Sequence, residues 1–279
     1  MQKRALAVHD ISCVGRCSLT VALPILSSVG VETAVLPTAV LSTHTGGFTG
    51  YTFRDLTDDI SPIVAHWKTL GLHYDAIYTG YLGSFRQLEL VSSIFDDLAA
   101  SDTLIMVDPV MADNGKLYAG FSEDFPKGMC DLCRKAKLVV PNLTEASLML
   151  GIPYRESYDK AYVEDVLRAL TDLGPDMAVL SGISFEKGKV GAAAYDKKSG
   201  RIYYYFSDHV DGYFHGTGDV FGSALLAGLM TGHPLNDSIR IAVDFTLGSI
   251  LRTKKDGTDI KYGVNFEGGL GGLIAACEG

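Results

Sequence analysis

The stretch that decides the fold is HGTGDVFGSALLAGL at residues 215–229. Two glycines, Gly216 and Gly218, surround a threonine, and Asp219 stands directly before an apolar run. Glycine reaches backbone conformations closed to other residues and lets a ligand approach the main chain. The pattern therefore predicts a glycine turn that leads into a helix over residues 219–231, with free N–H groups that favour an anion at its start.

Transfer of a phosphoryl group to an alcohol needs at least a site that binds the phosphoryl anion and a general base for the alcohol proton. A carboxylate beside an anion-binding turn supplies both. We expect the helix dipole to keep Asp219 ionised, so that it can accept the proton of an attacking hydroxyl. The alternative is that Asp219 only caps the helix and that the glycines only form a tight turn. A dinucleotide-binding loop fits less well, because its glycines follow the first strand with G-x-G-x-x-G spacing. The sequence contains no G-x-x-x-x-G-K-[ST], which excludes a P-loop kinase.

Outward from this stretch, apolar runs alternate between the periods of strands and helices. Expected strands lie at 4–10, 31–38, 74–83, 103–111, 137–142 and 177–182, and expected helices at 17–30, 61–71, 84–100, 143–150, 219–231 and 236–255. Residues 188–196 and 201–207 flank the turn KKSG and predict an antiparallel hairpin near one edge of the sheet. The order predicts an α/β fold, a three-layer α/β/α sandwich with a mostly parallel central sheet.

Two helix starts carry local signals. Ser61 and Pro62 form a good cap and first-turn pair for one helix. Ser84 and Gln87 have the spacing of a capping box for the next. In the hairpin, the alternation of side chains turns Tyr203 and Tyr205 to the same face. This favours packing in the core or in a dimer over stacking on a nucleotide base.

Polar residues cluster near the carboxyl ends of the expected strands. They are Asp10, His44, Tyr81, Asp108, Asn142 and Ser181. Ligands of parallel sheets bind beyond the carboxyl ends of the strands. We therefore expect the functional site at that edge of the sheet.

Composition narrows the class of protein. The 279 residues are 47% hydrophobic and 20% charged, with a net charge of −9. That charge disfavours general binding to nucleic acid or to an anionic membrane. The sequence has neither a secretory leader pattern nor an apolar run of membrane-spanning length. We expect a single soluble, cytoplasmic domain over residues 1–279.

Two of the five cysteines, Cys130 and Cys133, have the C-x-x-C spacing of some metal and redox sites. No nearby histidine completes a zinc site. We favour reduced thiols on or near a short helix.

The glycine-rich stretch resembles the signature of the ribokinase-like superfamily, in which G-x-G-D supplies an anion hole and a catalytic aspartate. Four further segments are similar, in order and spacing, to pyridoxal kinases: STHTGGF (42–48), TGYLGS (79–84), DPVMAD (108–113) and PNLTEA (141–146). The resemblance spans nearly the whole chain. The sequence lacks the glycine-rich N-terminal motif typical of sugar kinases in this superfamily.

The resemblance implies roles for the catalytic and nucleotide side. Asp219 would activate the acceptor hydroxyl, with Gly216, Thr217 and Gly218 as the anion hole. The residues implied at ATP are Asp108, Asp113, Asn142, Glu145 and Ser181, with Asp108 and Glu145 near magnesium, Glu145 through water. The alternatives are that Glu145 is a surface residue of a first helical turn, that Asp108 only caps a turn and that Ser181 only forms one.

On the acceptor side, the resemblance implies that Asp10, His44, Thr45 and Tyr81 bind the substrate, together with Asp219. Pyridoxal kinases often have serine at the end of the first strand, where this sequence has Asp10. An aspartate could pair with a protonated ring nitrogen or with an amine. The alternative for His44 and Tyr81 is a purely structural role.

The implied function is an ATP- and magnesium-dependent kinase that phosphorylates the 5′-hydroxyl of pyridoxal and related B6 vitamers. By family analogy alone, the enzyme would be a homodimer and a monovalent cation would assist. The first alternative is a hydroxymethylpyrimidine kinase, or an enzyme that accepts both rings, although those relatives commonly carry cysteine in place of Asp219. The second is a non-catalytic B6-binding protein.

Overall fold

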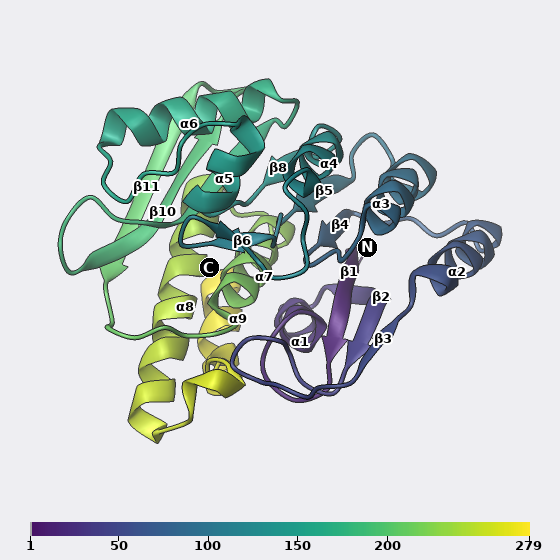
Figure 1. Cartoon of the computed structure of the whole chain (residues 1–279), viewed down its shortest axis with the longest axis horizontal. Coiled ribbons are helices and arrows are strands. Elements are labelled where there is room, and N and C mark those ends of the chain that lie inside the picture. Colours follow the sequence, from purple (N-terminus) through teal and green to yellow (C-terminus); the bar gives the residue numbers. More distant parts are fainter. Residues whose placement is uncertain (1) are drawn as a thin grey trace.

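A nine-stranded sheet runs through the computed structural model, which describes residues 2–279 (Figure 1). Its strands are β1 (Arg4–Ser12), β2 (Glu32–Leu41), β3 (Phe53–Asp55), β4 (Ala76–Thr79), β5 (Leu104–Val107), β8 (Leu138–Val139), β9 (Met177–Ile183), β10 (Lys189–Asp196) and β11 (Arg201–Asp208). The order is β11-β10-β9-β8-β5-β4-β1-β2-β3. The six strands from β9 to β2 pair in parallel, and antiparallel pairs close both edges. The mostly parallel sheet and its edge hairpin, β10–β11, are confirmed.

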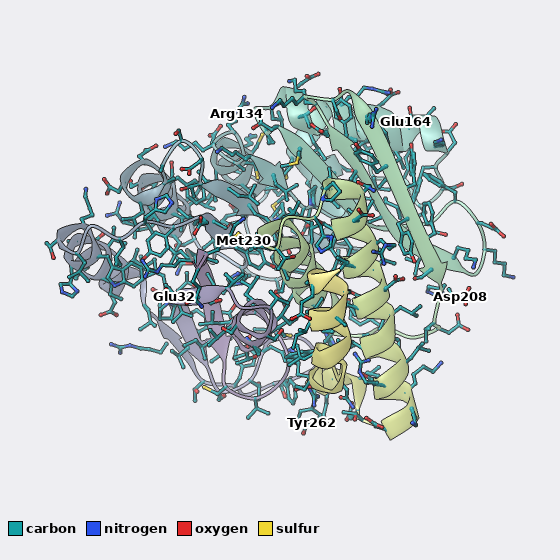
Figure 2. The ribbon with its side chains drawn as sticks, turned by 180° about the vertical axis from the view of Figure 1, so that it is seen from behind. Glu32, Arg134, Glu164, Asp208, Met230 and Tyr262 are labelled. Atoms are coloured by element: carbon teal, nitrogen blue, oxygen red, sulfur yellow. The ribbon has the colours of Figure 1, made fainter. Side chains whose placement is uncertain are left out.

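Helices cover both faces of this sheet. They are α1 (Leu19–Ser28), α2 (Thr57–Thr69), α3 (Phe85–Leu98), α4 (Phe125–Cys133), α5 (Leu143–Leu150), α6 (Lys160–Asp172), α7 (Thr217–Met230), α8 (Leu235–Asp256) and α9 (Leu270–Glu278), with short 3₁₀ turns η1 (Ile260–Tyr262) and η2 (Glu267–Gly269). Helices α2 to α6 pack on one face, and α1, α7, α8 and α9 on the other. Figure 2, seen from behind, shows α8 and α9 side by side over the second face. A small hairpin, β6 (Ala112–Asp113) with β7 (Lys116–Leu117), lies apart from the sheet.

Alternation along the strands divides the core between these layers. In β1, Leu6 and Val8 join the cluster under α2 to α6, whereas Ala5 joins the cluster under α7 and α8. Strands buried on both faces are apolar throughout, and this explains why β4, β5 and β8 occur as short continuous apolar runs. The three-layer sandwich that the sequence predicts is confirmed.

The predicted start of α2 is wrong. The helix begins at Thr57, whose N–H donates to a side-chain oxygen of Asp55 at 2.7 Å, so Pro62 lies inside it. Ile60 and Val64 are buried at i, i+4, and this apolar pair, rather than the Ser-Pro signal, sets where the helix forms.

The capping box predicted for α3 is half formed. Ser84 Oγ accepts the N–H of Gln87 at 3.2 Å, as predicted. The Gln87 side chain does not return to Ser84: it accepts from the N–H of Gly83 at 2.8 Å and donates to the carbonyl of Thr38 at 3.2 Å. The side chain thus ties α3 to the sheet.

The strand order reverses at β1, which lies between β4 and β2. The chain segments that leave β1 and β4 therefore diverge, and such a crevice at the carboxyl ends of parallel strands is where ligands bind in open α/β sheets. In the hairpin, Tyr203 and Tyr205 pack toward α8, and Tyr205 donates to Asp244 at 2.8 Å. Across residues 2–279, none of the helices combines the length and the apolar character needed to cross a membrane.

Candidate active site

The N-terminus of α7 opens toward the carboxyl edge of the sheet. Gly216 is its N-cap, with φ of +75°, and a Cβ there would collide with the carbonyl oxygen of Arg16. A Cβ at Gly218 would meet open space. The helix begins at Thr217, two residues earlier than predicted, so Asp219 is its third residue and not its cap. The hypothesis that Asp219 only caps the helix is therefore wrong.

Asp219 is half-buried, and its surroundings control its charge. Burial raises the pKa of this carboxyl to about 7, the backbone of Ser18 lowers it, and the charge of Asp10 raises it further. Burial thus opposes the helix dipole, which we expect to favour the ionised carboxylate. A carboxylate with a pKa near 7 is well matched to act as a general base at neutral pH.

Asp10 lies beside Asp219 at the switch point of the sheet, and it is 5% exposed. Its carboxylate accepts hydrogen bonds from Ser18 Oγ at 2.5 Å and from Ser12 Oγ at 3.3 Å. Burial raises the pKa of Asp10, and both hydroxyl donors lower it. The two serines therefore hold the carboxylate in one orientation.

Sequence reasoning missed two neighbours of these carboxylates. Ser18 precedes α1 as an N-cap would, yet its hydroxyl caps nothing and turns to Asp10 instead. Cys17 is half-buried, and its pKa is raised by burial and then by the charges of Asp219 and Asp10. The only available signal was a serine directly before an apolar helix. The bridge between Ile11 and Ser18, which returns the chain to β1, is a tertiary feature.

His44 joins two loops. Its Nδ1 accepts the N–H of Gly46 at 3.2 Å, so its Nε2 carries the proton and donates to the carbonyl of Lys261 at 2.6 Å. Burial lowers the pKa of His44, the carbonyl of Lys261 raises it, and the His215 ring, 5.4 Å away, lowers it. Both ring nitrogens therefore serve backbone groups, while Thr45 is exposed.

Tyr81 lies two residues after the end of β4. It is half-buried, and its ring lies 5.6 Å from that of Phe121. Burial raises the pKa of Tyr81, and the charge of Asp10 adds to this effect. The charge of Asp10 thus acts on both Tyr81 and Asp219, so the three side chains are neighbours.

Glu145 is buried, so the surface interpretation of this residue is wrong. Its Oε2 accepts the N–H of Asn142, whose side chain accepts the N–H of Glu145 in return, both at 2.9 Å. Its Oε1 accepts the N–H groups of Met111 at 2.9 Å and Ala112 at 3.4 Å. The NLTE segment is thus a capping box for α5 that also holds the loop after β5.

Asp108 follows β5 and is buried beside two other carboxylates. Burial raises its pKa well above the usual range, and the charges of Glu145 and then Asp219 raise it further. Burial also raises the pKa of Glu145 to about 7, against the lowering effect of its backbone donors. A buried carboxylate with two other carboxylates nearby favours a cation as a neighbour.

The remaining predicted residues line one pocket of about 200 Å³. Asp113, Asn142 and Ser181 lie on its wall, and backbone bridging joins the last two. Tyr213 donates to Asp113 at 3.3 Å, which ties the loop before α7 to this wall. The pocket is separate from Asp10 and Asp219.

Magnesium can be tested against these donors. Within the described part of the chain, no three His, Cys, Asp or Glu side chains gather closely enough to form a protein cage. Mg²⁺ usually binds through one or two carboxylates and keeps several waters, so such a cage is not required. Asp108 suits a direct ligand, whereas Glu145 already uses both oxygens for backbone N–H groups. Cys130 and Cys133 are buried on α4 as free thiols.

Comparisons with known proteins agree with this arrangement. The family model described as phosphomethylpyrimidine kinase matches residues 26–264. A Bacteroides thetaiotaomicron protein, provisionally named a phosphomethylpyrimidine kinase, is 40% identical, with a TM-score of 0.94 over 97% of this chain and 93% of that one. Another crystal form of it holds pyridoxal, with a TM-score of 0.93.

Two named pyridoxal kinases are also similar. The Lactobacillus plantarum enzyme is 31% identical, with a TM-score of 0.91 over 100% of this chain and 99% of that one. The Arabidopsis thaliana enzyme is 28% identical over 197 residues, which are 66% of this chain and 60% of that protein. The match therefore spans less than two thirds of the plant relative. On the family model and the full-length Lactobacillus match, the chain belongs to the phosphomethylpyrimidine kinase family, of ribokinase-like fold, together with its pyridoxal kinase relatives.

Proposed function

We propose that this chain is a kinase that transfers the γ-phosphoryl group of ATP to the 5′-hydroxyl of pyridoxal and related B6 vitamers. The observation that carries the proposal is Asp219, a carboxyl with a pKa of about 7 at the open N-terminus of α7 and beside the switch-point crevice. The Bacteroides relative that holds pyridoxal, 40% identical to this chain, supports the choice of acceptor.

In the proposed reaction, Asp219 takes the proton of the acceptor hydroxyl as its oxygen attacks the γ-phosphorus in line. The new O–P bond forms while the bond to the bridging oxygen of ADP breaks, so ADP leaves with the electron pair. The first N–H groups of α7, at Thr217 and Gly218, have no partner within the helix and face the developing charge. Open space at Gly218 leaves room for the phosphoryl oxygens.

On the nucleotide side, we propose that Asp113, Asn142 and Ser181 contact ATP from their shared pocket. Asp108 would bind magnesium directly and Glu145 through water. Magnesium, when bound, would neutralise the phosphates and draw the three carboxylates into their ionised state. A monovalent cation remains a proposal by family analogy.

On the acceptor side, Asp10 and Tyr81 would contact the pyridine ring from the ends of β1 and β4. His44 would offer its ring face or hold its loop, because its nitrogens are engaged, and Thr45 would close over the ring from that loop. A single domain over residues 1–279, a cytoplasmic location and a homodimer belong to the same proposal. Light scattering of the purified protein tests the homodimer.

A second candidate is phosphorylation of hydroxymethylpyrimidine, favoured by the description of the matching family model. The decisive measurement is ADP release from Mg-ATP with pyridoxal, pyridoxamine or hydroxymethylpyrimidine as acceptor, beside an Asp219→Asn variant. We expect vitamer-dependent turnover that falls roughly a hundredfold or more in the variant. Turnover only with hydroxymethylpyrimidine would support the second candidate function and contradict the first. Binding of vitamers without any turnover would indicate a non-catalytic B6-binding protein.

A further inference from the structure

A fully buried tyrosine lies beneath the candidate active site. Tyr78 is on β4 with its side chain on the α7 face of the sheet, and none of its surface is exposed. Its hydroxyl has no hydrogen-bond partner within residues 2–279, and the hydroxyl of Ser223 on α7 has none either. Ser223 is a hydrogen-bonding neighbour that lowers the pKa of Tyr78, but the contact between the two hydroxyls falls short of good hydrogen-bond geometry.

The phenol oxygen lies against the first turns of α7. A Cβ built at Gly222 would stand 2.5 Å from the Tyr78 oxygen, so glycine is required there for the close approach. Asp219 precedes Gly222 by three positions and Ser223 by four, so all three share one face of the helix. On the sheet side, Tyr78 pairs with Met106, two residues before Asp108. The hydroxyl thus lies between the strand that carries Asp108 and the helix that carries Asp219.

Leaving a hydroxyl unpartnered in the core costs stability, so its retention needs a reason. Burial raises the pKa of Tyr78 far above its usual value, and the charges of Asp108 and then Asp219 add to this effect. The phenol therefore stays protonated and remains a donor. An ionised carboxylate can only accept hydrogen bonds, so a buried phenol is a suitable donor for it. In active sites without substrate, hydrogen bonds are often long and tighten only when the substrate binds.

We propose that Tyr78 is a positioning residue of the phosphoryl-transfer site, whose hydroxyl donates to the carboxylate of Asp219 when the acceptor is bound. The inference rests on the proposed function. Asp219 is the partner rather than Asp108, because it shares the helix face of Gly222, against which the Tyr78 oxygen lies. Tyr78 would fix the direction in which Asp219 presents its lone pair to the acceptor hydroxyl.

The test compares Tyr78→Phe with Tyr74→Phe. Tyr74 is also fully buried and its hydroxyl also lacks a partner, but it packs on the other face of the sheet, near Arg4 at the amino ends of the strands. Steady-state kinetics with saturating Mg-ATP and the melting temperature are measured for wild type and both variants. The same comparison is made for Tyr78→Phe within Asp219→Asn.

We expect Tyr78→Phe to lower kcat about tenfold or more, as for a lost hydrogen bond to a charged group, with KM for the vitamer changed less than about twofold. Its melting temperature should equal or exceed that of wild type, because an unpartnered hydroxyl is removed. Tyr74→Phe should keep its kcat. In the Asp219→Asn background, Tyr78→Phe should lower kcat by less than about twofold, because the proposed partner of Tyr78 is already changed.

A kcat for Tyr78→Phe within twofold of wild type would overturn the inference, as would an equal loss in both backgrounds. A loss of activity accompanied by a lower melting temperature would indicate a merely structural tyrosine. No turnover by the wild type would instead contradict the proposed function, which separates the two failures.

Discussion

Gly216 and Gly218 stand two residues apart but differ in backbone conformation and in what surrounds them. At Gly216 the backbone is left-handed and the carbonyl of Arg16 occupies the place of a side chain, so the constraint is on folding. At Gly218 the backbone is helical and the space above it is open, so nothing in the protein requires glycine. The open space is instead what a ligand at the helix N-terminus needs.

Alanine at each position should separate these roles. Gly216→Ala should lower the free energy of unfolding by at least ~2 kcal/mol, through the left-handed backbone and the contact with Arg16. Gly218→Ala should leave stability unchanged or slightly higher, since alanine favours the helix, yet lower kcat by roughly tenfold or more. Urea unfolding and ADP release measure the two effects. Full activity in Gly218→Ala would show that the phosphoryl group binds elsewhere.

At the scale of elements, α5 and the loop after β5 are joined through one buried carboxylate. Glu145 accepts three backbone N–H groups, from Asn142, Met111 and Ala112, and thereby fixes the segment that follows Asp108. A helix cap thus also shapes the loop of the proposed metal site. The link explains why a first-turn glutamate is buried rather than solvated.

The effect of Glu145→Ala on stability should depend on pH. The folded pKa of Glu145, about 7, exceeds its ordinary value of 4.5, so the stability that this carboxyl contributes is full below pH 4.5 and is lost as pH rises through 7. Relative to wild type, the free energy of unfolding of Glu145→Ala should therefore be lower by on the order of 2 kcal/mol more at pH 5 than at pH 8. Urea unfolding at both pH values measures the difference. Glu164→Ala, which removes an ion pair with Arg168 and a hydrogen bond from Tyr204, is the control and should lose the same free energy of unfolding at both pH values. An equal loss for Glu145→Ala at both pH values would contradict the prediction.

At the scale of the whole molecule, the acid stability of the fold should depend on His9. Its side chain, on β1, is fully buried and edge-on to Tyr78 of β4, with 4.5 Å between the ring centroids, and both ring nitrogens lack partners within the described residues. Burial lowers its pKa to about 3, so the neutral ring is compatible with the core and the charged ring is not. The stability that neutral His9 permits is full above pH 6.5 and is lost as pH falls toward 3.

Replacing His9 by phenylalanine keeps an aromatic ring against Tyr78. The variant should therefore lose less of its unfolding free energy than the wild type as pH falls. Between pH 7 and pH 4, wild type should lose about 3 kcal/mol more of its unfolding free energy than His9→Phe. Guanidinium unfolding across this range provides the measurement, with the exposed His66→Leu as the control. Parallel curves for wild type and His9→Phe would show that another group governs acid unfolding.

The sequence by itself determined the local features. Continuous apolar runs identified β5, β8 and β9 as central strands, because a strand covered on both faces has no polar side to display. Gly216, just before Thr217, marked a helix N-terminus, because few other residues tolerate its left-handed backbone. These signals lie within a few residues of one another, so pattern and propensity suffice to interpret them.

Only the tertiary structure decided the electrostatics of the site. The pKa of Asp219 near 7, the diversion of Ser18 from its helix to Asp10 and the burial of Glu145 all depend on residues distant in the chain. The start of α2 followed the buried pair Ile60 and Val64 rather than its local Ser-Pro signal. Desolvation and long-range hydrogen bonds are properties of the packed layers, and a linear sequence specifies them only through the fold that it produces.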